Sequence, residues 1–135
     1  MKTFKKKLQN LRSVGPVVEV SFYDMKSPSN PVKGLALIDT GATCSCIDKD
    51  VAERLNLIMC DKLRVYSHTG NMLCDVFDVE MTFTEMNLTI DCFVLNAHLA
   101  PQPYIALIGR DVLGSFKFSY DGKENSYSLN YLKSK

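Results

Sequence analysis

The chain has 135 residues, a formal net charge of +1 and 46% hydrophobic residues. This length suits one compact domain, and the apolar content is far above that of disordered chains. The near-neutral charge excludes a global field that would draw the protein onto nucleic acid or a membrane. No stretch of the sequence reaches the roughly 18 apolar residues that a membrane span needs.

The N-terminus departs from this even charge balance. Its basic residues are Lys2, Lys5, Lys6, Lys7 and Arg12. We expect residues 1–13 to form a basic, flexible leader, because solvated termini of this composition are common. An arm that binds nucleic acid or a membrane surface is the alternative, although we expect neither partner. No apolar run follows the charges, so the sequence predicts no secretory signal.

Five cysteines are present, at positions 44, 46, 60, 74 and 92. The number is odd and no pair has C-x-x-C spacing, which favours reduced thiols and a cytoplasmic location over a disulfide framework. Cys44 and Cys46 could form a metal site with His68 or His98, but buried structural thiols are the commoner case. We therefore predict no metal and no cofactor.

The chain reads as short strands separated by turns. Alternating or continuous apolar runs predict strands, and a glycine-bearing break within such a run predicts a hairpin. In the first half of the chain, the sequence predicts strands at 17–23 and 32–38, a short strand at 46–47, and a helix at 49–57 with Asp48 as its N-cap. A hairpin follows, formed by 63–67 and 72–84 around a tip at 68–71. In the second half, the sequence predicts strands at 88–95 and 105–108, a short helix at 110–116, and a final hairpin of 118–120 with 126–131. These elements add up to an all-β domain with one or two short helices.

Asp39, Thr40 and Gly41 follow directly on the apolar run Leu35–Ile38. A carboxylate at the end of a buried strand is costly unless it has a partner, a proton or a use. A helix-capping or turn role is the plain alternative. The chain holds one Asp-Thr-Gly, so a site built from paired carboxylates would need a second copy of the chain.

Two segments carry a family resemblance. Residues 36–42, Ala-Leu-Ile-Asp-Thr-Gly-Ala, resemble the active-site loop of the retroviral-type aspartic proteases, the retropepsins. Residues 106–113, Ala-Leu-Ile-Gly-Arg-Asp-Val-Leu, resemble the segment before that family's short C-terminal helix, and residues 126–131 resemble its closing strand. Both viral members and small stand-alone bacterial members are similar.

The resemblance implies a fold and a domain division. The expected fold is a retropepsin-like closed β-barrel, the acid-protease fold, with one lobe per chain. The protease domain would span residues 14–132, and residues 133–135 would form a tail. In the family, terminal strands of two subunits interleave into one sheet, so 127–132 would be an edge strand used for dimerisation; an edge that stays within one chain is the alternative.

The resemblance also implies a site. Asp39, Thr40 and Gly41 would be catalytic, with Thr40 interlocking across a two-fold axis. Matching positions would bind a polypeptide substrate: Ala42, Thr43, Thr69, Gly70 and Ile108. Gly109 and Arg110 would be structural, because their segment packs beneath the loop.

One position departs from the family pattern. Arg110 would pair in the family with an aspartate two residues after the catalytic glycine, where this chain has Thr43. Arg110 must then find another acid or a backbone carbonyl. The neighbouring Asp111 is expected to cap the short helix.

The function implied is a homodimeric aspartic endopeptidase in which the Asp39 carboxylates of two chains share one proton and activate water. The alternative is a non-catalytic module of the same fold that dimerises and grips a peptide without cutting it.

Overall fold

The computed structural model describes residues 2–23, 30–67 and 69–132. The strands of this part are β1 (Thr3–Lys7), β2 (Val17–Phe22), β3 (Val32–Ile38), β4 (Cys46–Asp48), β5 (Met59–Ser67), β6 (Gly70–Phe83), β7 (Leu88–Ala97), β8 (Ala106–Ile108), β9 (Phe116–Asp121) and β10 (Ser126–Tyr131). The helices are α1 (Leu11–Val14), α2 (Lys49–Arg54), α3 (Arg110–Leu113) and a 3-10 turn, η1 (Thr84–Met86). The all-β prediction is confirmed, and α1 is a short helix that the sequence did not predict.

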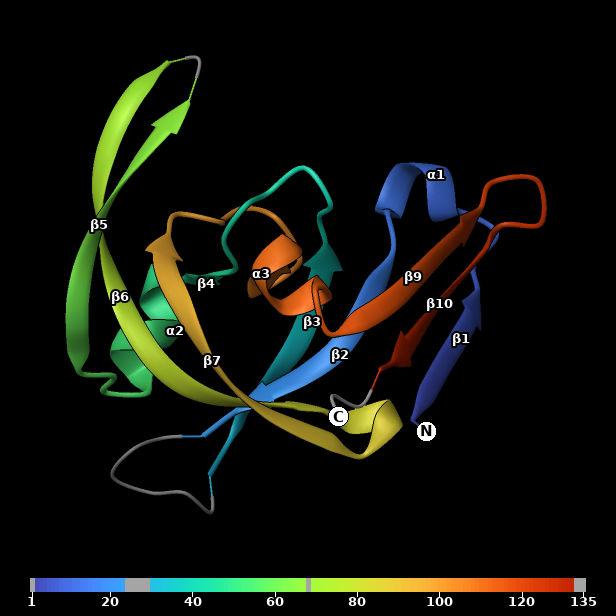
Figure 1. Cartoon of the computed structure of the whole chain (residues 1–135), viewed down its shortest axis with the longest axis horizontal. Helices are drawn as coiled ribbons and strands as arrows, with labels where there is room; N and C mark the ends of the chain where they lie inside the picture. The colour runs from blue at the N-terminus through green and yellow to red at the C-terminus, as the bar shows by residue number, and fades with distance from the viewer. Residues whose placement is uncertain (1, 24–29, 68, 133–135) are drawn as a thin grey trace.

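The larger sheet is a closed barrel. Its strand order is β2-β3-β8-β4-β7-β6-β5, and β2 pairs with β6 as well as with β3. That second pairing, from Val20 opposite Phe83 to Phe22 opposite Met81, joins the two sides of the sheet. Strand β5 pairs with the first half of β6 and projects with it from the barrel as a hairpin (Figure 1). The predicted closed barrel is thus confirmed.

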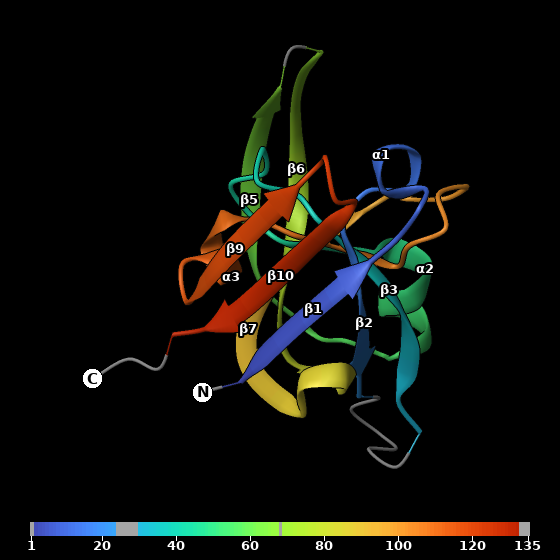
Figure 2. The same cartoon turned by 90° about the vertical axis from the view of Figure 1, so that its right-hand side faces the viewer.

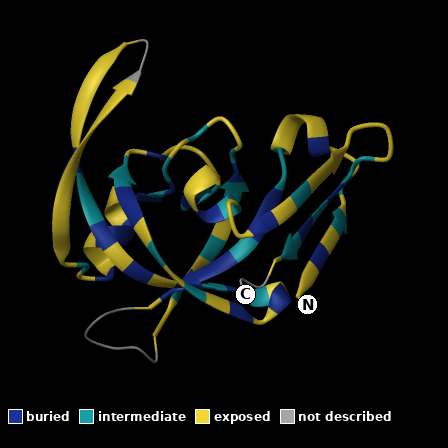
Figure 3. Cartoon of the chain, viewed as in Figure 1, coloured by how far each residue is buried: buried dark blue, intermediate teal, exposed yellow. Residues whose placement is uncertain are grey.

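The barrel strands direct alternate side chains into one core. Phe22, Phe83, Ile47 and Leu55 are among the largest side chains buried there. Figure 3 shows the resulting alternation of buried and exposed residues along β6 and β7, whereas β5 is exposed along the projecting hairpin. Burial of this apolar surface is the main force that stabilises the barrel.

A second sheet, of order β1-β10-β9, lies across one side of the barrel (Figure 2). Tyr127 of β10 ties the sheets together, because its hydroxyl donates to the Val17 carbonyl and accepts from the Val17 N–H at 3.2 Å. Burial raises the pKa of the Tyr127 hydroxyl, so it remains a proton donor at neutral pH.

The expected flexible leader at 1–13 is wrong for the residues described. Thr3–Lys7 form β1, which pairs with β10 from Thr3 opposite Asn130 to Lys7 opposite Ser126. Phe4 is 5% exposed and its ring centroid lies 5.8 Å from that of Tyr127, while Leu11 is fully buried. The sequence did not predict this strand, because Phe4 is its single inward-facing aromatic residue and lysines flank it. Residues 133–135 lie outside the described part.

The terminal strand is not a free edge. Strand β10 lies between β1 and β9 and is paired along both of its sides. The expectation that 127–132 offers an edge to a second subunit is therefore wrong. The outer sides of β9 and β1 are the edges of this sheet, and any sheet continued into another copy would begin at one of them.

Candidate active site

Asp39 stands at the exit of β3, as the sequence predicts. Ala36 and Ile38 of that strand are buried, Asp39 is half-buried, and Thr40 and Gly41 are exposed. The Asp39 N–H donates to the Ile108 carbonyl at 2.9 Å, which continues the pairing of β3 with β8. One carboxylate oxygen, Oδ1, accepts the Gly41 N–H at 3.0 Å. The side chain is thereby oriented by its own loop.

The loop of residues 39–45, which we call the aspartate loop, rests on the start of α3. The Arg110 N–H donates to the Ala42 carbonyl at 2.8 Å, and the Asp111 N–H donates to the Thr43 carbonyl at 3.2 Å. These are first-turn N–H groups, which have no partner within a helix. The helix start and the loop therefore satisfy each other's backbone groups.

Gly109 makes this approach possible. A Cβ at residue 109 would lie 2.8 Å from the carbonyl carbon and oxygen of Cys44 and 2.9 Å from the Ala42 oxygen. Those are backbone atoms that cannot rotate away. The sequence prediction that Gly109 is structural thus acquires a steric reason, since only glycine lets the two segments pack this closely.

A buried hydroxyl joins the same two segments. Ser45 is 1% exposed. Its Oγ donates to Asp111 Oδ1 at 2.7 Å and accepts the Gly109 N–H at 2.9 Å, and its own N–H donates to Asp111 Oδ2 at 3.0 Å. Asp111 also accepts the Val112 N–H at 2.8 Å. The prediction that Asp111 is the N-cap of the helix is wrong: Gly109 occupies that position, and Asp111 anchors the aspartate loop through Ser45.

Two partners were expected for Arg110, another acid or a backbone carbonyl, and the structure shows the carbonyl. Its Nη1 donates to the Thr40 carbonyl at 2.7 Å, and its Nη2 donates to the Thr43 hydroxyl at 3.2 Å. Thr43 therefore receives the guanidinium at the place where the family has an aspartate. The fork of Arg110 spans the loop and holds both of its halves.

Ile108 is a buried residue. It is 1% exposed and belongs to the core, whereas its neighbour Leu107 on β8 is half-buried on the opposite side. The prediction that Ile108 lines a substrate pocket is wrong because successive residues of a strand face opposite ways.

The hairpin β5–β6, here called the flap, has one apolar face. Val65 lies opposite Met72, and Leu63 lies opposite Cys74. With Thr69, Gly70, Cys46 and Leu95, residues of this face line a groove of about 450 Å³. Thr69 and Gly70 thus line the same groove as Cys46, the residue after the aspartate loop, although Asp39 does not line this groove in the single chain. His68 lies outside the described residues.

Tyr66 belongs to the other face of the flap. It is paired opposite Asn71, and its side chain is among the most exposed of the large hydrophobic residues. On that face Arg64 Nη1 donates to Asn71 Oδ1, and Lys62 pairs with Asp75 at 2.9 Å. The flap is therefore amphipathic, with its apolar side turned toward Cys46.

The thiols near the site are protonated at neutral pH. Burial, followed by the negative charge of neighbouring groups, raises the pKa of Cys46 to about 11, and burial with the charge of Asp111 raises that of Cys44. Such thiols are poor nucleophiles and poor metal ligands. In residues 2–23, 30–67 and 69–132, no group of three or more His, Cys, Asp or Glu side chains could hold a metal ion, and no helix is long and apolar enough to cross a membrane.

Sequence reasoning missed Ser45, the role of Asp111, and the groove residues Val65, Met72 and Leu95. The pattern of 63–76 held a usable signal, since Leu63, Val65, Met72, Cys74 and Val76 share one face of the hairpin. Ser45 had no such signal, because its partners are 64 and 66 residues away.

No protein-family model matches the chain, and no curated protein is similar to it in sequence. Solved structures are similar in fold. The EIAV protease complexed with the inhibitor HBY-793 has a TM-score of 0.56 at 21% identity, over 79% of this chain and 91% of that chain. A retropepsin-like aspartic protease from Rickettsia conorii has a TM-score of 0.53 at 17% identity, over 88% and 95%.

A longer enzyme matches as well. The aspartic proteinase from Irpex lacteus has a TM-score of 0.52 at 13% identity, and the match covers 98% of this chain but 48% of that one. Together these likenesses show that the chain has a retropepsin-like fold.

Proposed function

We propose that the chain is one half of an aspartic endopeptidase, completed when two copies bring their Asp39 carboxylates together. The observation that carries this proposal is the anchored aspartate loop: eight hydrogen bonds between residues 108–111 and the loop hold Asp39 half-buried while Thr40 and Gly41 stay exposed. A loop held this firmly, with its acidic end at the surface, suits a site that a second copy completes.

The paired site would work with one shared proton. Two carboxylates in contact resist ionising together, so the pair shares one proton. The ionised group takes a proton from water, the resulting hydroxide adds to the peptide carbonyl carbon, and the protonated carboxyl gives its proton to the carbonyl oxygen. Collapse of this adduct breaks the C–N bond as a proton passes to nitrogen, and the pair is left with one proton again.

Two further features support this reading. The apolar face of the flap and the groove beside Cys46 suit a peptide that lies extended, with alternate side chains entering the groove. The match to 48% of the Irpex lacteus proteinase agrees with one lobe per chain. Because the five cysteines are free thiols, a reducing compartment such as the cytoplasm is the expected location.

Replacing Asp39 with asparagine tests the chemistry. Asp39→Asn should abolish peptide cleavage while the fold, followed by circular dichroism, is unchanged. Asp50→Asn, an exposed aspartate on α2, is the matched control and should cleave normally. Cleavage retained by Asp39→Asn would refute the proposed aspartic peptidase. If wild type never cuts peptides and Asp39→Asn binds them as well as wild type does, the non-catalytic module is supported.

Mixing subunits tests the pairing. Wild-type protein titrated with excess Asp39→Asn should lose activity, because mixed dimers hold one carboxylate where two are needed. An enzyme that acts as a single chain would keep its full activity in the same mixture.

A further inference from the structure

A second groove, of about 520 Å³, lies where the base of the flap meets β7 and α3. We call it the basal groove. Its apolar floor consists of Leu63, Val76, Phe93 and Leu95, and Asp61 and Asp111 stand at its rim. This volume is in the range of sites that take a small ligand or a few side chains.

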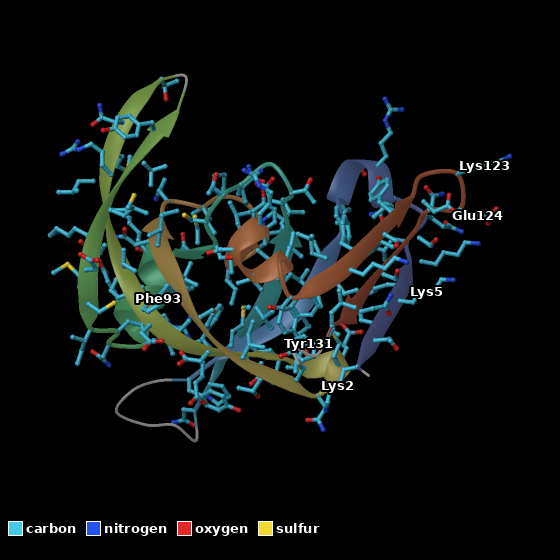
Figure 4. All side chains as sticks on the ribbon, in the orientation of Figure 1. Lys2, Lys5, Phe93, Lys123, Glu124 and Tyr131 are labelled. Carbon is cyan, nitrogen blue, oxygen red and sulfur yellow. The ribbon has the colours of Figure 1, made fainter. Side chains whose placement is uncertain are left out.

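Two of the apolar residues that line the basal groove are exposed. Phe93 is 60% exposed and Leu63 is 43% exposed. Phe93 projects from β7 on the side of the molecule away from Lys5 and Lys123 (Figure 4). Apolar surface gathered in a concave site, in contrast to scattered surface residues, is typical of a place where a ligand binds.

The charged side chains that line the basal groove are acidic. Of the described residues that line it, those with charge are Asp61 and Asp111, and none is basic. Lys62, the nearest lysine in sequence, points to the other face of the flap, where it pairs with Asp75. The groove adjoining it across Phe93 is lined by Asp91 and Asp111, again without a basic residue among those described.

The charges of three acids reach Cys92, the neighbour of Phe93 on β7. Burial raises the pKa of Cys92 to about 12, and the charges of Asp111, Asp91 and Asp78 add to that effect. A cation placed beside Phe93 would meet several acids and no competing positive group in the lining.

The basal groove adjoins the groove along the flap at a shared lining residue. Leu95 lines both of them, and the basal groove also reaches Cys44 of the aspartate loop. A peptide extended along the apolar face of the flap would thus carry a side chain into the basal groove, beyond the residues next to the bond that is cut.

We propose that the basal groove is a specificity subsite for a lysine or arginine side chain of the polypeptide substrate. This inference rests on the proposed function, which supplies the bound peptide. The methylene stem lies on Leu63 and Val76, as long basic side chains lie on apolar surface. The cationic end meets Asp61 and Asp111, with the face of Phe93 beside it.

Cleavage of a peptide library, read by mass spectrometry, tests the subsite. Wild-type protein should enrich lysine or arginine at one substrate position outside the two that flank the cut. Asp61→Asn, which keeps the Oδ1 acceptor of the Lys62 N–H, should lower kcat/KM for a basic peptide about tenfold, the effect of losing one charge contact of about 1.4 kcal/mol. The same peptide with glutamine at that position should be unaffected.

A charge reversal sharpens the test. Asp61→Lys should prefer glutamate at the position where wild type prefers lysine. Glu85→Lys, the same change at an exposed site on η1, is the matched control and should keep the wild-type preference. No basic preference in wild type, or equal losses for basic and glutamine peptides, would overturn the proposal.

Binding separates this inference from the proposed function. Fluorescence anisotropy with Asp39→Asn protein should show tighter binding of the basic peptide than of its glutamine form, and Asp61→Asn on that background should remove the difference. If wild type never cleaves but this difference is present, the enzyme is refuted and the subsite stands. If cleavage occurs without the difference, the subsite is refuted and the enzyme stands.

Discussion

Ser45 and Asp111 are joined by two hydrogen bonds, although 66 residues separate them. The serine hydroxyl donates to one carboxylate oxygen at 2.7 Å, and the serine N–H donates to the other at 3.0 Å. The same hydroxyl accepts the N–H of Gly109, so one buried group connects the aspartate loop to the segment beneath it. The loop that carries Asp39 is thus tied to the start of α3.

Removing the Ser45 hydroxyl should destabilise the protein. Ser45→Ala leaves the buried Gly109 N–H without its acceptor and takes one bond from Asp111, which should cost about 1–3 kcal/mol in the free energy of unfolding. Urea denaturation measures it, and Ser119→Ala, an exposed serine on β9, should change stability by less than about 0.5 kcal/mol. Equal effects of the two variants would contradict the role given to Ser45.

A methyl group at residue 109 should disrupt the loop. Gly109→Ala places its Cβ against the backbone of Cys44 and Ala42, and such overpacking costs about 1–3 kcal/mol or more. Gly114→Ala is the matched control, because its Cβ would have ordinary contacts of 3.5 and 3.7 Å. Thermal unfolding should show a lower Tm for Gly109→Ala and no loss for Gly114→Ala; a shared response would show that glycine at residue 109 has no steric role.

Arg110 should matter more for activity than for stability. Arg110→Lys keeps the charge but cannot span Thr40 and Thr43 with one rigid fork. Because Arg110 is exposed, we expect a loss of about 1 kcal/mol or less in unfolding free energy. We expect a larger, roughly tenfold or greater, loss of kcat/KM as the loop loses its alignment.

The threonine partner of Arg110 offers a graded comparison. Thr43→Val removes the acceptor hydroxyl but leaves the Thr40 carbonyl contact intact. Its loss of kcat/KM should be smaller than that of Arg110→Lys. A variant of Arg110 with unchanged peptidase kinetics would show that the fork does not align the loop.

Asp78 and Asp91 should make stability depend on pH. A hydrogen bond to the Asp91 carboxyl, with a smaller effect of burial and the charges of Asp91 and Glu80, raises the pKa of exposed Asp78. The folded state therefore holds this proton more tightly than the unfolded state. Its stabilising effect is present below the ordinary aspartate pKa and is lost as the pH rises through the raised value.

Asp78→Asn removes that dependence. Its stability relative to wild type should increase as the pH rises from about 4 to about 7, since the wild type then gains repulsion between ionised neighbours. Urea midpoints across this range measure the difference, with Glu85→Gln as the control. A constant difference between Asp78→Asn and wild type at every pH would rule out the shared proton.

The resemblance to a known family, and no local pattern, implied that the segment at Gly109 packs beneath the aspartate loop. The sequence alone determined the strand that delivers Asp39 and the all-β class. These features are local, because apolar runs and turn residues predict strands directly. The flap could also be predicted from the sequence, because its two strands are adjacent in sequence and its tip carries Gly70.

Only the tertiary structure decided which residues of these elements face the site. Strand β8 has only apolar residues (Ala106, Leu107 and Ile108), so no polar residue marks the side of the strand that faces outward. The sequence therefore could not show which of them lines a pocket, and the assignment of Ile108 was wrong. Likewise β1, the inner place of β10 and the bond between Ser45 and Asp111 depend on segments that are distant in the chain. Contacts of this kind follow from packing across the whole barrel, which no local pattern of residues records.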